Sequence, residues 1–328
     1  MRRERRKSMR NGTAKGKIPA IWKRIPGNVY TLLVITLVFW IVCKPGTFLT
    51  GSNMINIAGQ CSFLAIASIG SLLAIITGGI DLSVGGIMCF SGVVAAVLSK
   101  GGMPMVLAVP VALLAGTAAG AVNGIIIAKN NVAPFIITLA MWNITDSLAL
   151  VVAKGATVSV NTDEFRLLGS GELGFLPYCV IIAAAVYAIF HVITRKTRSG
   201  TYIYAIGGNE SAAHLTGINV ARSKFLVYTL SGLTAALAGV LLASKLGSAN
   251  PGQGDGYEFY GIASAVVAGA SMAGGNGTVW NTLIGALIIT ILRSGLNIAG
   301  MPNSWQMVVL GLVIVGVVFV DVMSRREK

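Results

Sequence analysis

Two residues of opposite charge, Asp146 and Arg293, lie in the middle of long apolar segments of this chain. A charged side chain at the centre of a bilayer costs about 2.5–3.5 kcal/mol on insertion scales, so it is expected to find a partner or a wet cavity. Asn143 and Ser147 lie within one helical turn of Asp146, and Asn297 lies one turn beyond Arg293. The pattern predicts an ion pair between two helices or two separate polar sites. The simpler alternative is that Arg293 reaches the membrane interface.

A second group of chemically versatile residues is the string GGIDLSVGG, which spans Gly78–Gly86. Its first two glycines interrupt an apolar segment, and Asp81 and Ser83 suit the N-cap of the helix that should follow. Gly79 and Gly85 allow another backbone to approach closely. The string is therefore either a plain helix–turn–helix cap or a loop with a specific role in function.

The longest polar interruption in the second half of the chain covers residues 194–224 and carries five basic residues and one acid, Glu210. Short loops rich in Lys and Arg stay on the cytoplasmic side of a membrane. Asn209 is a good N-cap, Glu210 suits the first turn of a helix, and Gly217 is a good terminator. The pattern predicts a short amphipathic cytoplasmic helix, which is either an ordinary connection or a docking element.

Residue types needed for catalysis or for metal and nucleotide binding are scarce. The four cysteines all fall in or beside apolar segments without paired spacing, and only two histidines are present, so we expect buried thiols and no metal site. No G-x-x-x-x-G-K-[ST] string occurs, and no nucleophile–base pair stands out. We therefore expect neither an enzyme nor a bound cofactor.

The elements that position these residues are membrane helices, because 55% of the 328 residues are hydrophobic and only 11% are charged. Of the 25 Lys and Arg residues, nineteen fall on one side of the predicted membrane and five on the other, which is typical of the positive-inside rule. The net charge of +14 is thus explained by topology, and nucleic acid is not expected as a partner. Hydropathy predicts ten spans, at 29–42, 55–77, 84–98, 105–128, 134–153, 175–193, 225–244, 259–273, 278–298 and 305–323.

The sequence therefore predicts an all-α polytopic membrane protein with about ten transmembrane helices and both termini in the cytoplasm. Residues 1–27 form a basic cytoplasmic tail, 28–323 the membrane domain, and 324–328 a short cytoplasmic tail. The third and eighth spans are short and are expected to be broken or re-entrant. The strings Ile-Ala-Ser and Gly-Gly recur at an offset of 196 residues, which is a weak indication of an internal repeat.

Two polar loops, 154–174 and 245–258, face the side opposite the basic loops and carry five acidic residues. Exposed charges in such loops attract oppositely charged groups in a salt-dependent manner. The five residues are Asp163, Glu164, Glu172, Asp255 and Glu258.

Several of these strings together resemble one protein family. GGIDLSVGG, NGIIIAKNNVAPFIITL (123–139), AIGGNESAAHLTGINV (205–220), GDGYEF (254–259) and GGNGTVWNTLIGALI (274–288) are similar, in this order, to the permease subunits of ribose-type ABC importers. That group also includes permeases for branched-chain amino acids. The resemblance extends from about residue 53 to 321. The chain departs from the family pattern at Asp146-Ser147, Arg293-Ser294, Ala270 and Asn281.

The resemblance implies a permease of the bacterial inner membrane that carries a monosaccharide, or another small polar solute. It implies three partners: a separate ATPase, a periplasmic or lipid-anchored binding protein, and a second identical or homologous permease. It also implies that Glu210, Ala212, Ala213 and Gly217 belong to the helix that couples the permease to the ATPase. The polar residues that we assign to the solute pathway are Gln60, Asn123, Asn143, Asp146, Arg293 and Asn297.

An ion-coupled secondary transporter is the competing class. It would need intramembrane acids as coupling sites, and Asp146 is the one acid that the predicted spans place in mid-membrane. A partnership with Arg293 would neutralise that acid, which argues against ion coupling.

Overall fold

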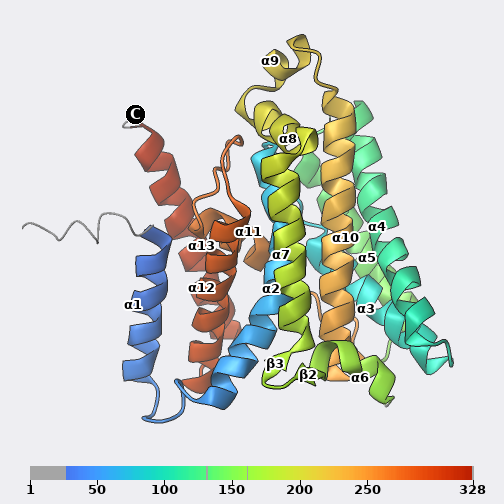
Figure 1. Ribbon diagram of the computed structural model, residues 1–328, viewed down its shortest axis with the longest axis vertical. Helices are drawn as coiled ribbons and strands as arrows, with labels where there is room; N and C mark the ends of the chain where they lie inside the picture. Colours follow the sequence, from blue (N-terminus) through green and yellow to red (C-terminus); the bar gives the residue numbers. More distant parts are fainter. Residues whose placement is uncertain (1–26, 131, 161, 327–328) are drawn as a thin grey trace, which may run out of the picture.

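The computed structural model describes residues 27–130, 132–160 and 162–326, which form a bundle of α-helices (Figure 1). The basic tail predicted at 1–27 lies, apart from Gly27, outside these residues. The longer helices are α1 (Gly27–Val42), α2 (Gly51–Ile76), α3 (Val84–Lys100), α4 (Met105–Asn130), α5 (Pro134–Val152), α7 (Tyr178–Lys196), α10 (Val220–Leu246), α12 (Val279–Ile298) and α13 (Asn303–Arg326). The shorter ones are α6 (Asp163–Ser170), α8 (Arg198–Gly208), α9 (Glu210–Leu215) and α11 (Tyr257–Val267).

Six helices of the described chain are long and apolar enough to cross a membrane: α2, α4, α5, α7, α10 and α12. Helices α1 and α3, and residues 304–316 of α13, are apolar but shorter. The predicted eighth span, 259–273, is not one continuous helix, because α11 ends at Val267. Its 11 residues reach only about 17 Å at 1.5 Å per residue, less than the ~30 Å hydrocarbon core. The break expected in this segment is therefore present. Helix α13 continues to Arg326, beyond the boundary predicted at residue 323.

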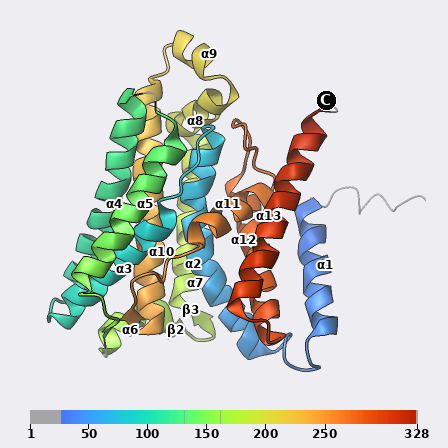
Figure 2. The same ribbon diagram turned by 180° about the vertical axis from the view of Figure 1, so that it is seen from behind.

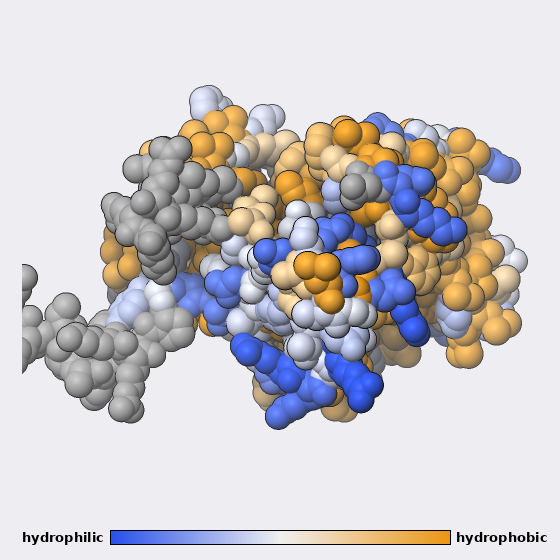
Figure 3. Space-filling view, turned by 90° about the horizontal axis from the view of Figure 1, so that it is seen from above, coloured by the Kyte–Doolittle hydropathy of each residue, from blue (hydrophilic) through white to orange (hydrophobic). Residues whose placement is uncertain are grey.

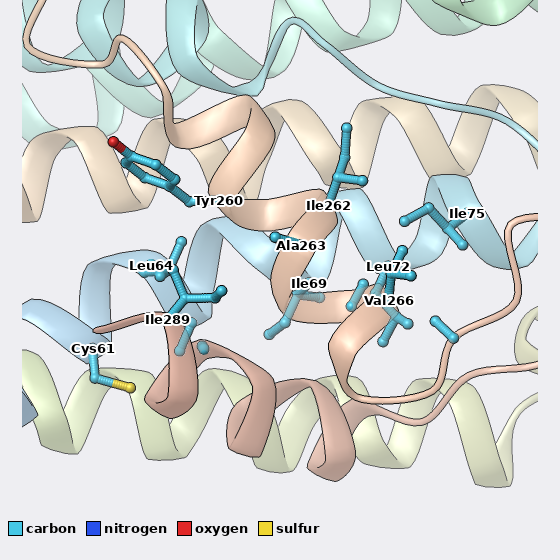
Figure 4. Packing of buried hydrophobic residues seen from close by; sticks show 14 of the residues in the cluster. Cys61, Leu64, Ile69, Leu72, Ile75, Tyr260, Ile262, Ala263, Val266 and Ile289 are labelled. Carbon is cyan, nitrogen blue, oxygen red and sulfur yellow. The ribbon is translucent and has the colours of Figure 1, made fainter. Parts of the chain in front are cut away.

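Helix α2 is the core of the molecule. Its own side chains are apolar on nearly all of its faces, which is the pattern of a buried helix. Every residue from Cys61 to Ile76 is buried. It packs against α7, α10, α11 and α12, and the two opposite views show it enclosed by these helices (Figures 1 and 2). Figure 4 shows the contact with α11, where Ala263 and Val266 lie beside Ile69 and Leu72.

Helices α4 and α10 form the closest helix pair through small residues. Gly116, Gly120 and Gly124 recur every four positions on one face of α4. A Cβ on Gly120 would lie 2.5 Å from the Tyr228 carbonyl oxygen and 2.8 Å from the Gly232 Cα. Such a glycine stripe lets two membrane helices approach at backbone distance, where dispersion contacts are most numerous.

The turn after α2 and the segment before α12 meet at the same end of the bundle. The Gly275 amide donates a hydrogen bond to the Ile76 carbonyl at 2.8 Å. A Cβ on Gly274 would lie 3.1 Å from the Gly78 nitrogen, and both glycines have positive φ. The two Gly-Gly strings of the suspected repeat are therefore neighbours in space, one just after α2 and the other in the segment between α11 and α12.

The segment predicted as a polar outer loop, 154–174, is folded rather than irregular. It contains β1 (Val158–Ser159), α6 and β2 (Glu172–Leu173). Strand β1 pairs antiparallel with β4 (Ser248–Ala249), and β2 pairs with β3 (Leu176–Pro177). The Gly169 amide donates to Ser244 Oγ at 2.7 Å, so α6 is held against the end of α10.

The two ends of the bundle differ. In Figure 1, α8, α9 and the C-terminus of α13 lie toward one end, and α6, the β2–β3 hairpin and the α1–α2 connection lie at the other. Seen from the α9 end, hydrophilic residues gather over the centre and hydrophobic residues occupy much of the periphery (Figure 3). This is the distribution expected of a membrane protein that exposes one polar end to water.

Candidate functional site

The GGIDLSVGG loop is organised around the buried carboxylate of Asp81. Its Oδ1 accepts hydrogen bonds from the Ser83 amide at 2.9 Å and from Ser83 Oγ at 2.6 Å. Its Oδ2 accepts from Ser231 Oγ of α10 at 2.6 Å. Asn123 Nδ2 of α4 donates to Ser83 Oγ at 3.0 Å, which ties a third helix to the loop. The carboxylate thus links the α2–α3 turn to α10 directly and to α4 through Ser83.

This arrangement corrects one expectation. The Ser83 side chain makes no cap hydrogen bond to α3, because it donates to Asp81 instead. Asn123 is fully buried within this network, and its place on the solute pathway stays a prediction.

The glycines of the same string make room for neighbours. A Cβ on Gly79 would overlap the Tyr228 hydroxyl, and one on Gly85 would overlap Oε2 of Glu258 and lie 2.6 Å from the Gly254 carbonyl oxygen. The predicted close approach is thus present at both positions. It brings the start of α3 against the loop that precedes α11.

Three of the predicted pathway residues line one polar cavity. Gln60 of α2 and Arg293 and Asn297 of α12 face a space of about 600 Å³, which we call the vestibule. Its other polar lining residues are Asn53, Asn56, Ser294 and Gln306. Ile298, Met301 and Pro302 complete its lining, and the cavity lies toward the end of α2 opposite α9.

Arg293 does not pair with Asp146. Within the described residues one salt bridge is formed, between Lys224 and Glu210, so the predicted ion pair between α5 and α12 is wrong. Instead, the guanidinium carbon of Arg293 lies 4.3 Å from the Tyr260 ring centroid and 5.9 Å from that of Tyr257. Stacking on aromatic faces stabilises a desolvated guanidinium, and Arg is well suited to it.

The two other predicted pathway residues are on α5. Asn143 is exposed, and its Nδ2 donates back to the Leu139 carbonyl at 3.1 Å, so its assignment to the solute pathway stays a prediction. Asp146 is half-buried, and its Oδ1 lacks a hydrogen-bond partner among the described residues. Its carboxylate is within electrostatic reach of Asp255 and Glu258.

The sequence did not indicate that Trp142, Glu258 and Tyr260 lie near Asp146 and Arg293. Glu258 was assigned to an exposed outer loop, but its side chain is only 2% exposed, so it is not available to a docking protein. The glycines on both sides of it, which let the chain turn inward, were the signal that could have found it.

The short helix predicted in the basic loop is present as α9. Asn209 is its N-cap, accepting a hydrogen bond from the Ala212 amide at 2.9 Å, and Gly217 follows its end with a φ of +84°. Ala213, however, is 4% exposed and packs inward, so the small residues do not form one outer face. Outward-facing positions include Ala212 and Leu215, the latter 86% exposed.

Helix α8, just before α9, is in direct contact with the core. A Cβ on Gly207 would overlap the Ile76 carbonyl oxygen and lie 2.5 Å from the Gly275 nitrogen. Tyr204 Oη donates to the Gly277 carbonyl at 2.6 Å, and burial raises the pKa of this phenol, which keeps the donor proton in place. Helix α8 is therefore joined both to the end of α2 and to the segment between α11 and α12.

In the described part of the chain, no group of three His, Cys, Asp or Glu residues is arranged to bind a metal ion. The four cysteines are free and buried, as expected of small apolar side chains.

Comparison with known proteins identifies relatives along most of the chain. The family described as "Branched-chain amino acid transport system / permease component" matches residues 53–318. The ribose import permease protein of Escherichia coli (strain K12) is 43% identical over 278 residues, covering 84% of this chain and 87% of that protein. The ribose import permease protein of Bacillus subtilis (strain 168) is 39% identical over 277 residues, covering 84% and 86%.

The D-allose transport system permease protein of Escherichia coli (strain K12) is 36% identical over 296 residues, covering 90% of each chain. No solved structure matches the chain. Relatives of this kind are membrane subunits of transporters and not enzymes. The matched residues make up most of the chain and include the vestibule, the Asp81 network and α9. Because of this match and the 43% identity with a ribose import permease, the chain belongs to the permease component family of ABC transport systems and is a multi-pass inner-membrane protein.

Proposed function

We propose that this permease forms the membrane pathway for a monosaccharide, a pentose or hexose related to ribose. The observation that carries the proposal is the 43% identity with a ribose import permease over 278 residues. The allose permease, at 36% identity, supports the same substrate class.

The vestibule suits a polyhydroxylated solute. Side-chain amides both donate and accept hydrogen bonds, so the amide groups in its lining can exchange bonds with hydroxyl groups in many orientations. There are five of them, on Asn53, Asn56, Gln60, Asn297 and Gln306. Arg293 adds donors only. The volume of the vestibule, about 600 Å³, lies within the usual range for small-ligand cavities.

The polar ends of the bundle suit the expected partners. We propose that a separate ATPase docks on α9, through the outward face that includes Glu210, Ala212 and Leu215, while Ala213 and Gly217 shape the helix and its end. A periplasmic or lipid-anchored sugar-binding protein would dock at the opposite end, near the acidic residues of α6 and β2. A second permease, identical or homologous, completes the transporter.

The proposed topology keeps ten membrane segments, of which α3 and α11 are the short ones, with both termini in the cytoplasm. The direction of the helices in Figure 1 supports it, since α1 descends from the α9 side and α13 returns toward it. In this topology the basic residues of α8–α10 lie in the cytoplasm.

The test is transport by the reconstituted importer. The permease, its ATPase and its binding protein are placed in proteoliposomes, and uptake of labelled D-ribose is measured with and without ATP and vanadate. Uptake that needs ATP, is blocked by vanadate and is reduced by excess D-allose supports the proposal. Uptake of labelled L-leucine instead of either sugar would refute the substrate class. Ribose uptake driven by a proton or sodium gradient without ATP would refute the ABC mechanism.

A further inference from the structure

A second cavity of about 580 Å³ lies between α5, the start of α11 and α13, and it is not part of the vestibule. One wall carries polar and aromatic side chains, among them Trp142, Asp255, Glu258 and Tyr260. The opposite wall is apolar and comes from α13, with Met307, Leu310, Gly311, Ile314 and Val315.

The polar wall holds groups without a hydrogen-bond partner. Trp142 Nε1 and Glu258 Oε2 are buried and unpartnered among the described residues, and so is Asp146 Oδ1 on the next turn of α5 from Trp142. Glu258 is 2% exposed, and its other oxygen, Oε1, accepts from the Gly256 amide at 3.1 Å. A buried polar group left unpaired is unfavourable, so such a cluster indicates a missing partner.

The chemistry of the wall selects the class of that partner. The C–H face of a sugar ring packs on flat aromatic side chains, and its hydroxyl groups donate to carboxylates and accept from an indole N–H. A lipid chain or an apolar helix would fill the volume but would leave the indole N–H and the carboxylate oxygen unpaired. Ligand cavities of this size are commonly apolar with a few placed polar groups.

The cavity is also next to the vestibule. Tyr260 lines the cavity, and Arg293, which lies 4.3 Å from the centroid of the same ring, lines the vestibule. The two spaces therefore share one aromatic–guanidinium contact as their boundary. Gly85 contributes by leaving room for Glu258, because a Cβ there would overlap Oε2.

We propose that this cavity is a monosaccharide-binding station on the transport pathway, in which Trp142 and Tyr260 pack on the sugar ring and Asp255 and Glu258 accept hydrogen bonds from its hydroxyl groups. The inference rests on the proposed function, because a sugar must be the transported solute. It goes further by placing the solute inside the membrane domain beyond the vestibule.

The experiment combines transport with a direct measure of occupancy. Uptake of labelled D-ribose is measured for the complete importer carrying Trp142→Ala, Glu258→Gln or the control Trp305→Ala, which changes an exposed tryptophan of α13 outside the cavity. Occupancy is measured on the permease in nanodiscs by maleimide labelling of Phe259→Cys, a position in the cavity wall, with and without D-ribose. Leu150→Cys, an exposed position of α5 outside the cavity, is the labelling control.

If the cavity binds the sugar, Trp142→Ala and Glu258→Gln should each take up D-ribose about tenfold more slowly than the unmodified importer. The first loses a contact with the sugar ring, and the second loses a charged hydrogen-bond acceptor. Trp305→Ala should transport normally, and the ATPase activity stimulated by the loaded binding protein should persist in all three. D-ribose should slow the labelling of Phe259→Cys several-fold and leave Leu150→Cys unchanged.

Two results overturn different claims. If the unmodified importer takes up neither D-ribose nor D-allose, the proposed function fails. If it takes up ribose but both cavity variants match Trp305→Ala, or ribose leaves Phe259→Cys labelling unchanged, the station is refuted and the proposed function stands. Should Trp142→Ala fail to assemble with the ATPase, the isosteric Glu258→Gln and the labelling result decide the question.

Discussion

Substituting Gly207 with Ala tests whether the contact between α8 and the core transmits the motion of the ATPase to the pathway. Gly207 and Gly208 are adjacent helical glycines with different surroundings. A Cβ on Gly207 would overlap the Ile76 carbonyl oxygen and crowd the Gly275 nitrogen, whereas a Cβ on Gly208 would have no heavy atom within 4 Å. Gly208→Ala is therefore a matched control.

The expected magnitudes follow from these surroundings. Replacing glycine by alanine inside a helix stabilises it by roughly 0.5–1 kcal/mol, so Gly208→Ala should be neutral or slightly stabilising. For Gly207→Ala the neighbours are backbone atoms that cannot rotate away, and overpacking costs about 1–3 kcal/mol. Separation of α8 from α2 also weakens the hydrogen bond from Gly275 to Ile76, a further ~0.5–1.5 kcal/mol. The net effect should be a loss of about 1–3 kcal/mol at this contact.

The assay compares ribose uptake and ATP hydrolysis in the same proteoliposomes. If the contact transmits motion, Gly207→Ala should lower the sugar transported per ATP by about tenfold or more, since 1.36 kcal/mol corresponds to a factor of ten. Thermal unfolding in detergent reports whether the fold survives. Equal transport per ATP in Gly207→Ala and Gly208→Ala, with both proteins folded, would refute the reasoning.

Four further outcomes are expected. Gly217→Leu should uncouple uptake from ATP hydrolysis in a correctly inserted protein, because a leucine side chain is strained at the φ of +84° that this residue adopts. The control Gly217→Asn should be tolerated, since asparagine adopts this conformation more readily. Normal coupling in the leucine variant would exclude α9 as the docking helix. Ser231→Ala should lower thermal stability by about 1–3 kcal/mol, because it removes a donor from the buried Asp81 carboxylate, and an unchanged unfolding temperature would contradict this. Asp146→Asn and Arg293→Gln should have additive effects on folded yield and uptake, because the two residues form no salt bridge; strong coupling in the double variant would show that they meet in another state. Neutralising the exposed acids of α6 and β2, which are Asp163, Glu164 and Glu172, should weaken docking of the binding protein at low salt, and 0.5 M salt should largely remove this effect. Docking that is indifferent to all three changes would exclude the idea.

Features set by local chemistry could be predicted from the sequence. The apolar segments, the helix α9 with its cap Asn209 and its terminator Gly217, and the close approach at Gly85 are each fixed by a few neighbouring residues. Family membership was also predictable, since it rests on strings of residues in a fixed order. The burial of all four cysteines followed from the apolar segments around them.

The partners of polar groups could not be predicted, because they depend on how helices pack. Asp81 was expected to cap α3, but its carboxylate binds Ser231, 150 positions away. Pairing of Arg293 with Asp146 was one alternative that the opposite charges left open, but two tyrosines of α11 contact Arg293 instead. Hydropathy has no information about which face of one helix meets which face of another.

The sequence by itself determined that this chain is a permease of the membrane, through its apolar segments, its distribution of positive charge and its family strings. Only the tertiary structure decided that the loop before α11 turns inward and buries Glu258, since a turn into the core depends on the space that Gly85 leaves on another helix. The same holds for the vestibule, which exists because α2, α12 and α13 bring polar residues far apart in the sequence to one cavity. Local residue type fixes secondary structure and membrane insertion, whereas long-range packing fixes where the remaining polar groups find their partners.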